Sequence, residues 1–337
     1  MSLSRVIAIV SSTEGMEDAP VFKPLAIALA LLSGPVLAQP FSFAVLGDMP
    51  YGPPETSHAL FSSLIEAINA ARPALVIHVG DTKSGGSPCS DAALAEQLAF
   101  LNSFEAPVLY TPGDNEWTDC HAPRAGGHDP RERLAHIRAT YFATPDQSLG
   151  ARPIPVESQS ALGYPENVRL MMHDIAFITA HVVGSNNGFE AQNLATAEEY
   201  FARDAANRDW LAEGFAVAQA AEARAMVLAI HGDMFEFDFS LPWNAEGFLR
   251  HSGFARFANV LTEEANRFGR PVLLIFGDSH MFRMFQPFPA TAPGIIALET
   301  FGAENMHAVR VQVTPEAPYP FTIQPLFNPA LRLVPAR

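Results

Sequence analysis

Short apolar runs that end in glycine and aspartate recur along this chain, and they limit its possible folds more than any other feature. Four runs end in this way, at Gly47-Asp48, Gly80-Asp81, Gly113-Asp114 and Gly277-Asp278. A fifth run, over 226–230, is followed by His231. Runs of this length that are rich in Val, Ile and Leu are typical of strands buried on both faces. Because the strands of one sheet end together, we expect these five tips to converge and to form a metal site.

Helical segments separate these strands. In the first half of the chain we expect strands at 41–46, 74–79 and 107–111 and helices at 56–71, 90–103 and 130–142. Such a series predicts a parallel sheet with right-handed crossovers. In the second half we expect a hairpin at 168–172 and 175–179, helices at 195–218 and 254–268, and strands at 225–230 and 271–276. The proline-punctuated tail predicts antiparallel strands that close a second sheet, at 295–298, 308–313 and 320–323.

The charge of the chain argues against one class of partner. It contains 36 Asp and Glu against 21 Lys and Arg, and no basic run interrupts this excess. A nucleic-acid partner is therefore not expected, because binding to a phosphate backbone needs clustered Lys and Arg. A small phosphorylated substrate held by metal ions is compatible with this charge. In the body of the chain, no stretch is long and apolar enough to span a bilayer.

The N-terminus has the pattern of a targeting segment. Lys23 precedes the apolar run 24–32, and a breaker then leads to Val36-Leu37-Ala38-Gln39. These features predict a secretory signal peptide cut after Ala38, with an uncleaved N-terminal helix as the alternative. Because Met16 would give a leader of ordinary length, we expect residues 1–15 to be an over-extended start. The sequence thus predicts an extension plus signal peptide over 1–38, a single domain over 39–337 and a secreted or periplasmic location.

The two cysteines follow the second and third strand tips. Cys89 comes after Gly80-Asp81, and Cys120 comes after Gly113-Asp114. If these strands are neighbours, both thiols lie on loops at one edge of the sheet, in an oxidising compartment. A Cys89–Cys120 disulfide is therefore predicted, and two unpaired thiols are the alternative.

The order of these motifs resembles that of the calcineurin-like metallophosphoesterase superfamily. The signature of that family reads D-x-H, G-D, G-N-H-[DE], H and G-H-x-H, and the resemblance covers nearly all of the chain after the signal peptide. The sequence from Gly113 to His121 is also similar to that of a divergent, secreted bacterial branch of this superfamily. The resemblance implies an α/β fold, a four-layer α/β/β/α sandwich of two mixed sheets, that binds two divalent metal ions.

The resemblance also implies a set of metal ligands. The residues at the matching positions are Asp48, Asp81, Asp114, His231, Asp278 and His280. By this correspondence Asp48 and His280 bind the first ion, and Asp81 bridges both ions. Asp114, His231 and Asp278 complete the second site. Asp114 and Asp278 replace an asparagine and a histidine of the family pattern. The first site lacks one ligand, because Pro50 occupies the histidine position of D-x-H, and Tyr51 is a weak substitute.

The chemistry of these ligands supports cation binding independently of the resemblance. Four aspartates that converge would repel one another and raise each other's pKa values unless cations neutralise them. Two divalent ions would cancel that charge. Carboxylate-rich ligation favours the harder ions Mn, Mg, Ca or Fe, and Zn stays an alternative.

The position of the family's catalytic histidine in G-N-H-[DE] is taken by Asn115. An asparagine cannot donate a proton as an acid, but its amide can hydrogen-bond a phosphate oxygen. His121 is a candidate proton donor, with a solvated loop residue as the alternative. His231, a predicted metal ligand, is also a candidate catalytic residue. Glu116 is expected to hold the loop rather than to touch substrate.

Three further residues are candidate substrate contacts. Lys83 follows Asp81 in a loop where relatives often place a phosphate-contacting residue, and a surface lysine is the alternative. His181 ends an expected strand, and Asn186 belongs to the polar, glycine-bearing loop beyond it. Loops of this kind often carry binding residues.

Together these features predict a secreted, metal-dependent phosphoester hydrolase. In the two-metal mechanism of the family, a bridging water becomes hydroxide and attacks the phosphorus of a phosphomonoester or phosphodiester. No protein nucleophile is needed. The alternative is a catalytically degenerate, metal-stabilised binding protein on the same scaffold, which the replacements at Pro50 and Asn115 favour.

Overall fold

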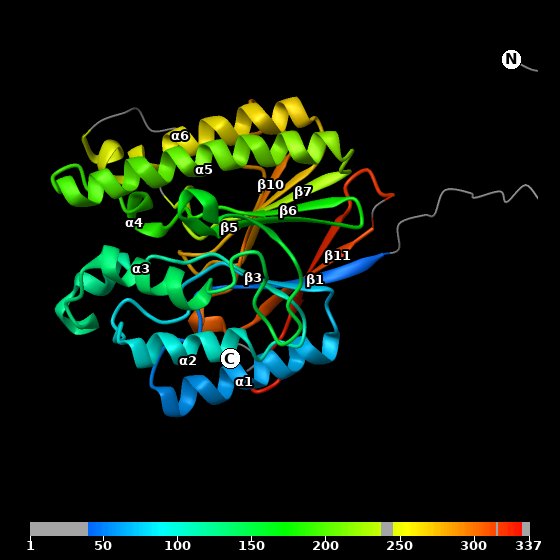
Figure 1. The fold of residues 1–337 in the computed structure, drawn as a ribbon. Coiled ribbons are helices and arrows are strands. Elements are labelled where there is room, and N and C mark those ends of the chain that lie inside the picture. The colour runs from blue at the N-terminus through cyan, green and yellow to red at the C-terminus, as the bar shows by residue number, and fades with distance from the viewer. Residues whose placement is uncertain (1–39, 237–244, 315, 332–337) are drawn as a thin grey trace, which may run out of the picture. The chain divides into compact units, whose positions relative to one another are not determined.

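The computed structural model of the protein describes residues 40–236, 245–314 and 316–331. These residues form two β-sheets with helices on their outer faces (Figure 1). The predicted signal peptide and extension over 1–38 lie outside the described residues. In the described ranges, no helix is long and apolar enough to cross a membrane.

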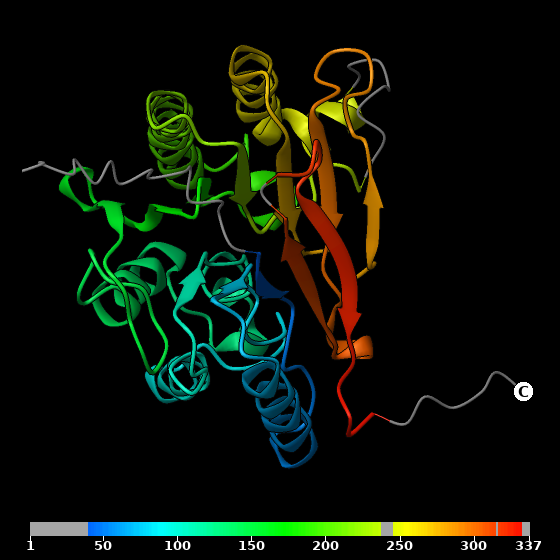
Figure 2. The same cartoon turned by 90° about the vertical axis from the view of Figure 1, so that its right-hand side faces the viewer.

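The first sheet has five strands in the order β12-β11-β1-β2-β3. Its strands are β1 (Phe41–Leu46), β2 (Leu75–His78), β3 (Val108–Tyr110), β11 (Ala308–Val313) and β12 (Phe321–Leu326). β1, β2 and β3 are parallel, whereas β11 pairs antiparallel with both β1 and β12. Figure 2 shows this C-terminal pair, in orange and red, near the blue β1. The carboxyl ends of β1, β2 and β3 therefore lie at one edge of the sheet.

The second sheet has seven strands in the order β4-β5-β6-β7-β8-β10-β9. Its strands are β4 (Glu157–Gln159), β5 (Tyr164–Met172), β6 (Ile175–Thr179), β7 (Ala225–Ala229), β8 (Val272–Phe276), β9 (Arg283–Phe285) and β10 (Ile295–Glu299). β6, β7, β8 and β10 are parallel, and β5 forms the predicted hairpin with β6. The edge strands β4 and β9 are antiparallel to their neighbours, and they are not among the predicted strands.

One prediction about the sheets is wrong, and a second is confirmed only in part. The sequence predicts one sheet for all five strand tips, but β1, β2 and β3 belong to the first sheet and β7 and β8 to the second. It also predicts that the tail forms antiparallel strands that close a second sheet. β11 and β12 are antiparallel, as predicted, but they extend the first sheet. β10 lies in the second sheet, where it is parallel to β8. The apolar pattern of a strand indicates how it is buried, but it does not identify the sheet that the strand joins.

Helices cover the outer face of each sheet (Figure 1). α1 (Pro54–Ala71), α2 (Asp91–Leu101) and α3 (Pro130–Tyr141) pack on the first sheet, and α5 (Leu194–Ala220) and α6 (Ala245–Phe268) pack on the second. Five short helical turns join these elements, at Thr118–His121, Pro123–Ala125, Ser160–Leu162, α4 (Gly184–Asn187) and Ala303–Asn305. All five predicted helices are present, although α6 begins at Ala245 rather than at residue 254.

Three apolar clusters fill the spaces between the layers. β1 shows the arrangement: Phe43 and Val45 pack between the two sheets, where Phe43 lies 5.3 Å from Phe177 between ring centroids. Ala44 and Leu46, on the other face of the strand, pack beneath the helices of the first sheet. A third cluster joins α5 and α6 to the second sheet. Burial on both faces explains the continuous apolar runs, and the predicted arrangement of two mixed sheets flanked by helices is confirmed.

Candidate metal centre

The ends of five strands from both sheets meet at one place. Asp48, Asp81 and Asp114 follow β1, β2 and β3, whereas His231 and Asp278 follow β7 and β8. Nε2 of His231 lies 3.1 Å from Oδ1 of Asp114, 3.5 Å from Oδ1 of Asp81 and 4.0 Å from Oδ1 of Asp278. The tips therefore converge, although they come from two sheets rather than from one.

Two groups of side chains in this cluster can each hold a metal ion. One group is Asp48, Asp81 and His231, and the other is Asp114, His231 and Asp278; within each, the ligand atoms lie within 4.8 Å of one another. The sixth predicted ligand, His280, lies beside the first group, with Nε2 3.6 Å from Oδ1 of Asp48. Carboxylate oxygen and imidazole nitrogen are donors that divalent first-row ions accept.

The backbone at these tips is unusual. Asp48, Asp81 and Asp278 have φ angles of 56°, 56° and 74°, in the left-handed region. Non-glycine residues are uncommon there and concentrate at functional sites. A Cβ atom on Gly113 would lie 2.0 Å from Oδ1 of Asp81, and one on Gly277 would lie 2.2 Å from Oδ2 of Asp48. These two glycines therefore make room for the carboxylate of another strand tip.

The ring of His231 is held in the orientation of a metal ligand. Its Nδ1 lies 2.7 Å from the backbone oxygen of Val79. A carbonyl oxygen can only accept a hydrogen bond, so Nδ1 carries the proton, and Nε2 presents its lone pair to the carboxylates when the ring is neutral. This pattern, in which one ring nitrogen donates to the backbone and the other faces the ion, is typical of metal-binding histidines.

Asp48 provides a separate test of whether a cation fits. The side chain is fully buried, and its Oδ1 accepts the backbone N–H of Asp278 at 3.0 Å. Among the described residues, Oδ2 of Asp48 has no hydrogen-bond partner. Burying an unpaired carboxylate oxygen is unfavourable. A cation between the strand tips would satisfy this oxygen, so the donor set fits a bound metal.

Without a cation, three of the four carboxylates hold protons more tightly than usual. Asp114 is the exception: burial would raise its pKa, but the hydrogen bond and charge of His231 lower it. Burial raises the pKa of Asp48 and Asp81 well above its ordinary value, and neighbouring carboxylates add to the effect. Burial and Asp114 raise the pKa of Asp278 to about 7. Burial alone would lower the pKa of His231, but Asp81 and the other carboxylates raise it well above its usual value. Because a cation would replace these protons, metal binding should release them.

Asn115 and Tyr51 both donate hydrogen bonds to Asp81. The side-chain amide of Asn115 donates to Oδ2 of Asp81 and, at 2.9 Å, to the hydroxyl of Tyr51. Its backbone N–H donates to Oδ1 of Asp81 at 3.0 Å. The Tyr51 hydroxyl donates to Oδ2 of Asp81 at 2.8 Å. The two residues therefore orient a predicted ligand, and in this geometry Tyr51 acts as a donor to Asp81 rather than as a ligand in its own right.

Glu116 holds the loop after β3, as predicted. Its Oε1 accepts the backbone N–H of Thr82 and, at 2.8 Å, the Thr82 hydroxyl. Its Oε2 accepts the backbone N–H groups of Gly113 and Asp81 at 3.0 and 3.2 Å. One buried carboxylate thus joins the tips of β2 and β3.

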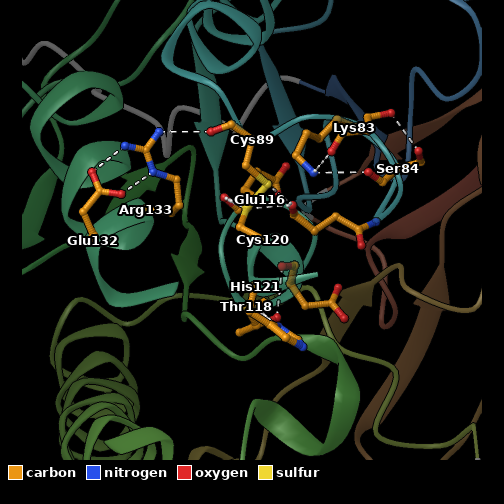
Figure 3. The surroundings of a disulfide bond; sticks show 12 residues. Lys83, Ser84, Cys89, Glu116, Thr118, Cys120, His121, Glu132 and Arg133 are labelled. Atoms are coloured by element: carbon orange, nitrogen blue, oxygen red, sulfur yellow. Dashed lines mark hydrogen bonds and ion pairs between the residues drawn. A yellow bond between two sulfur atoms is a disulfide. The ribbon is translucent and has the colours of Figure 1, made fainter. Parts of the chain in front are cut away.

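A disulfide links the same two loops (Figure 3). Cys89 and Cys120 are bonded, with their Cα atoms 5.8 Å apart, so the predicted disulfide is present. Arg133 of α3 donates to the backbone oxygen of Cys89 at 3.0 Å and pairs with Glu132. The disulfide therefore joins the two loops that follow Asp81 and Asp114, and Arg133 joins them to α3.

Replacing both cysteines in the variant Cys89→Ala/Cys120→Ala should lower the free energy of unfolding by about 3.7 kcal/mol. This is the chain-entropy value for a loop of this length, since the bonded residues are separated by 31 positions. Urea unfolding would measure the loss. Treatment of the wild type with a reductant should reproduce it, and the double variant should then show no further response. Equal stability of the variant and the oxidised wild type would contradict the prediction.

Lys83 and His121 lie in these loops as well (Figure 3). The Lys83 ammonium donates to the backbone oxygens of Ser84 and Ser87 at 3.2 and 3.3 Å, and burial lowers its pKa. His121 is exposed, with Nδ1 2.7 Å from the backbone oxygen of Thr118. Contact of either residue with substrate stays a prediction.

His181 has a different environment from the one predicted. Its side chain is fully buried just beyond β6, where Nδ1 lies 2.8 Å from Oε1 of Glu166 and the ring packs 5.5 Å from that of Trp117. A side chain without exposed surface cannot contact a substrate in this conformation, so we do not retain His181 as a substrate-binding residue. Asn186, in contrast, lines a pocket beside the cluster.

Two residues outside the predicted site also contact candidate ligands. The Ser185 hydroxyl donates to Oδ2 of Asp114 at 3.1 Å, and the backbone N–H of Asp233 donates to Oδ2 of Asp278 at 3.0 Å. Asp233 directly follows Gly232, so the Gly-Asp pattern that marks the other tips could have identified it. No comparable pattern marks Ser185, because its contact depends on how α4 folds.

Two pockets adjoin the cluster. One, of about 440 Å³, has Ser185, Asn186 and Asp278 among its lining residues. The other, of about 270 Å³, has Ser185, Trp117 and His121 among its own. Ser185, which contacts Asp114, lines both pockets, and the candidate ligand Asp278 lines the larger one.

Sequence comparison identifies one family. The family described as calcineurin-like phosphoesterase matches residues 41–282. No curated protein shows a significant match to the chain.

Three solved structures are similar to the chain at low sequence identity. A purple acid phosphatase from yellow lupin (Lupinus luteus) seeds is 10% identical, with a TM-score of 0.47, over 86% of this chain and 54% of that one. The protein TT1561 of Thermus thermophilus is 6% identical, with a TM-score of 0.41, over 86% and 100%. A 5′-nucleotidase from Candida albicans is 11% identical, with a TM-score of 0.40, over 84% and 50%. The chain thus spans about half the length of the lupin and Candida proteins.

Proposed function

Because the chain belongs to the calcineurin-like phosphoesterase family, we propose that it is a metal-dependent phosphoester hydrolase whose active site is the cluster at the strand tips. The observation that carries this proposal is the group of buried carboxylates around Nε2 of His231. Asp48, whose Oδ2 has no hydrogen-bond partner among the described residues, adds to it. We also propose that the protein is exported, on the basis of the signal-peptide pattern before Gln39.

The proposed centre holds two divalent cations, drawn from Mn, Fe, Mg, Ca and Zn. Asp48 and His280 would hold one ion, Asp114, His231 and Asp278 would hold the other, and Asp81 would contribute to both. When bound, such ions supply Lewis-acid activation of water and of phosphoryl oxygens. Two of these ligands are oriented by hydrogen bonds, Asp81 by the backbone N–H of Asn115 and His231 by the backbone oxygen of Val79.

The remaining residues of the site would orient the substrate. The amide of Asn115 is engaged with Asp81 and Tyr51, which suits a positioning role and not proton donation. His121, which lines the smaller pocket, is the proposed proton donor for the leaving group. Lys83 and Asn186 are proposed contacts of the small phosphorylated substrate, with Asn186 lining the larger pocket.

Chelation tests this function directly. We expect the purified protein to contain divalent metal and to hydrolyse p-nitrophenyl phosphate or bis(p-nitrophenyl) phosphate. Dialysis against EDTA should reduce turnover to background, and Mn²⁺ should restore it. Because the ions bind only the folded protein, Mn²⁺ at about 100 times its Kd should raise the free energy of unfolding by about 2.7 kcal/mol.

The outcomes separate this proposal from a non-catalytic one. Bound metal without turnover of either substrate at any pH would favour a metal-stabilised binding protein, in line with the replacement of the family's catalytic histidine by Asn115. Absence of both metal and turnover would rule out the proposed function.

A further inference from the structure

The loop between β8 and β9 presents its residues alternately to two sides. Asp278 and His280 face the candidate metal centre. The backbone N–H of Asp278 donates to Oδ1 of Asp48 at 3.0 Å, and Nε2 of His280 lies 3.6 Å from the same oxygen. The intervening Ser279 and the backbone N–H of Met281 face the opposite way, toward Glu299 at the end of β10. One side of the loop therefore forms the site, and the other side is fixed by a buried carboxylate.

Glu299 fixes this loop at three points. Its side chain is fully buried, and Oε1 accepts the Ser279 hydroxyl at 2.8 Å and the backbone N–H of Met281 at 2.7 Å. Its Oε2 accepts Nε of Arg283 at 2.5 Å. Both carboxylate oxygens are thus used, and every partner lies within three residues of Asp278 or His280.

Arg283 and Ser279 extend these contacts to the loop after β7. Arg283 pairs with Oδ2 of Asp233, and the Ser279 hydroxyl lies 2.6 Å from the same oxygen. The backbone N–H of Asp233 donates to Oδ2 of Asp278 at 3.0 Å. The network therefore joins the tips of β7, β8 and β10, which carry His231, Asp278 and Glu299.

The backbone of the loop needs such support. Asp278 and His280 have φ angles of 74° and 64°, in a region that residues other than glycine rarely adopt. Gly302, just beyond β10, packs directly under His280, where a Cβ atom would lie 2.3 Å from Cβ and Cγ of His280. Strained residues of this kind persist only where surrounding contacts fix them.

We infer that Glu299, acting with Arg283 and Asp233, is a positioning residue that holds Asp278 and His280 in place for the metal ions. This inference rests on the proposed metal centre. The hydrogen bonds of Glu299 to described residues go to Ser279, Met281 and Arg283 and not to a candidate ligand, so it would act through the loop. Supporting residues of this kind usually change metal affinity by about 10–100-fold when replaced.

The variant Glu299→Gln tests the inference. Gln keeps the shape of the side chain, but its amide nitrogen cannot accept the hydrogen bond from Nε of Arg283 when its oxygen serves Ser279 and Met281. We expect the Kd for Mn²⁺, measured by titration of the metal-free protein, to rise about 10–100-fold. The visible absorption spectrum of the Co²⁺-loaded variant should also change, because it reports the arrangement of the ligands.

Two further variants keep the test decisive. Ser279→Ala removes one hydroxyl and should raise the Kd for Mn²⁺ by about 10-fold, the lower end of the range expected for Glu299→Gln. This variant replaces Glu299→Gln in the test if Glu299→Gln does not fold. Glu264→Gln, which changes a glutamate paired with Arg267 on α6, should bind Mn²⁺ as the wild type does. Loss of stability in Glu299→Gln with unchanged Mn²⁺ affinity and Co²⁺ spectrum would overturn the inference. Failure of the wild type to bind Mn²⁺ would instead overturn the proposed function.

Discussion

Replacing Asp81 with asparagine is expected to remove metal binding and hydrolysis together while the protein stays folded. Asp81 contributes to the first group of candidate ligands and lies 3.5 Å from Nε2 of His231. Asparagine lacks the negative charge and one of the two ligand oxygens. Because changes to residues that only support ligands cost about 10–100-fold, loss of a shared ligand should lower kcat/KM by more than about 100-fold.

Thermal unfolding gives this variant a second readout. In EDTA, wild-type Asp81 is a buried carboxylate whose pKa is raised by burial and by neighbouring carboxylates, so removal of its charge should not destabilise the protein. Asn115 and Tyr51 can turn their polar groups to meet the new amide. Addition of Mn²⁺ should therefore raise the melting temperature of the wild type and leave that of Asp81→Asn unchanged.

A matched control separates this effect from a general loss of charge. Asp174, in the turn between β5 and β6, also has a left-handed backbone, with φ of 65°, but its side chain is 58% exposed. Asp174→Asn should retain metal, activity and the response to Mn²⁺. Retained activity in Asp81→Asn would refute the assignment of two ions that share this residue.

The strand tips were accessible to sequence reasoning because their signal is local. An apolar run indicates a strand that is buried on both faces. The glycine that follows it indicates a crowded turn, as the contact of Gly113 with Asp81 shows. Sheet membership is not local. Asp278 donates to Asp48 across 230 positions in the chain, and no pattern within either segment distinguishes two facing sheets from one.

Supporting residues were less accessible for the same reason. Glu299 is one acidic residue at the end of a strand, and only the folded β8–β9 loop gives it partners. The predicted role of His181 depended on its place after a strand, but Glu166 and Trp117 enclose its ring. Sequence position identified the tips of strands, whereas the direction of each side chain depended on tertiary contacts.

The contacts of Arg203 show how far such tertiary support extends. This residue of α5 is fully buried, and it donates to the backbone oxygens of His181 and Asn187, each at 2.9 Å, and to the side chain of Asn187 at 2.6 Å. It also pairs with Glu199 through Nε at 2.8 Å. Its guanidinium therefore fixes both ends of the segment that contains Ser185.

That segment is costly to form without support. Ser185, Asn186 and Asn187 have φ angles of 52°, 57° and 56°, so three successive non-glycine residues are left-handed. A left-handed residue costs roughly 1–2 kcal/mol relative to the right-handed form, although asparagine tolerates this conformation better than most residues. The turn directs the Ser185 hydroxyl to Asp114, so its stability bears on the candidate metal centre as well as on the fold.

Arg203→Met should therefore lower the free energy of unfolding by about 3–5 kcal/mol, the usual effect of removing one partner from a buried ion pair. Methionine fills much of the same volume, but it leaves Glu199 and the backbone oxygens of His181 and Asn187 without their donor. Urea unfolding of the metal-free protein would measure the loss. Arg267→Met is the control, because that side chain is 66% exposed, and exposed pairs contribute about 0–1 kcal/mol. Equal losses in the two variants would show that Arg203 does not hold the turn.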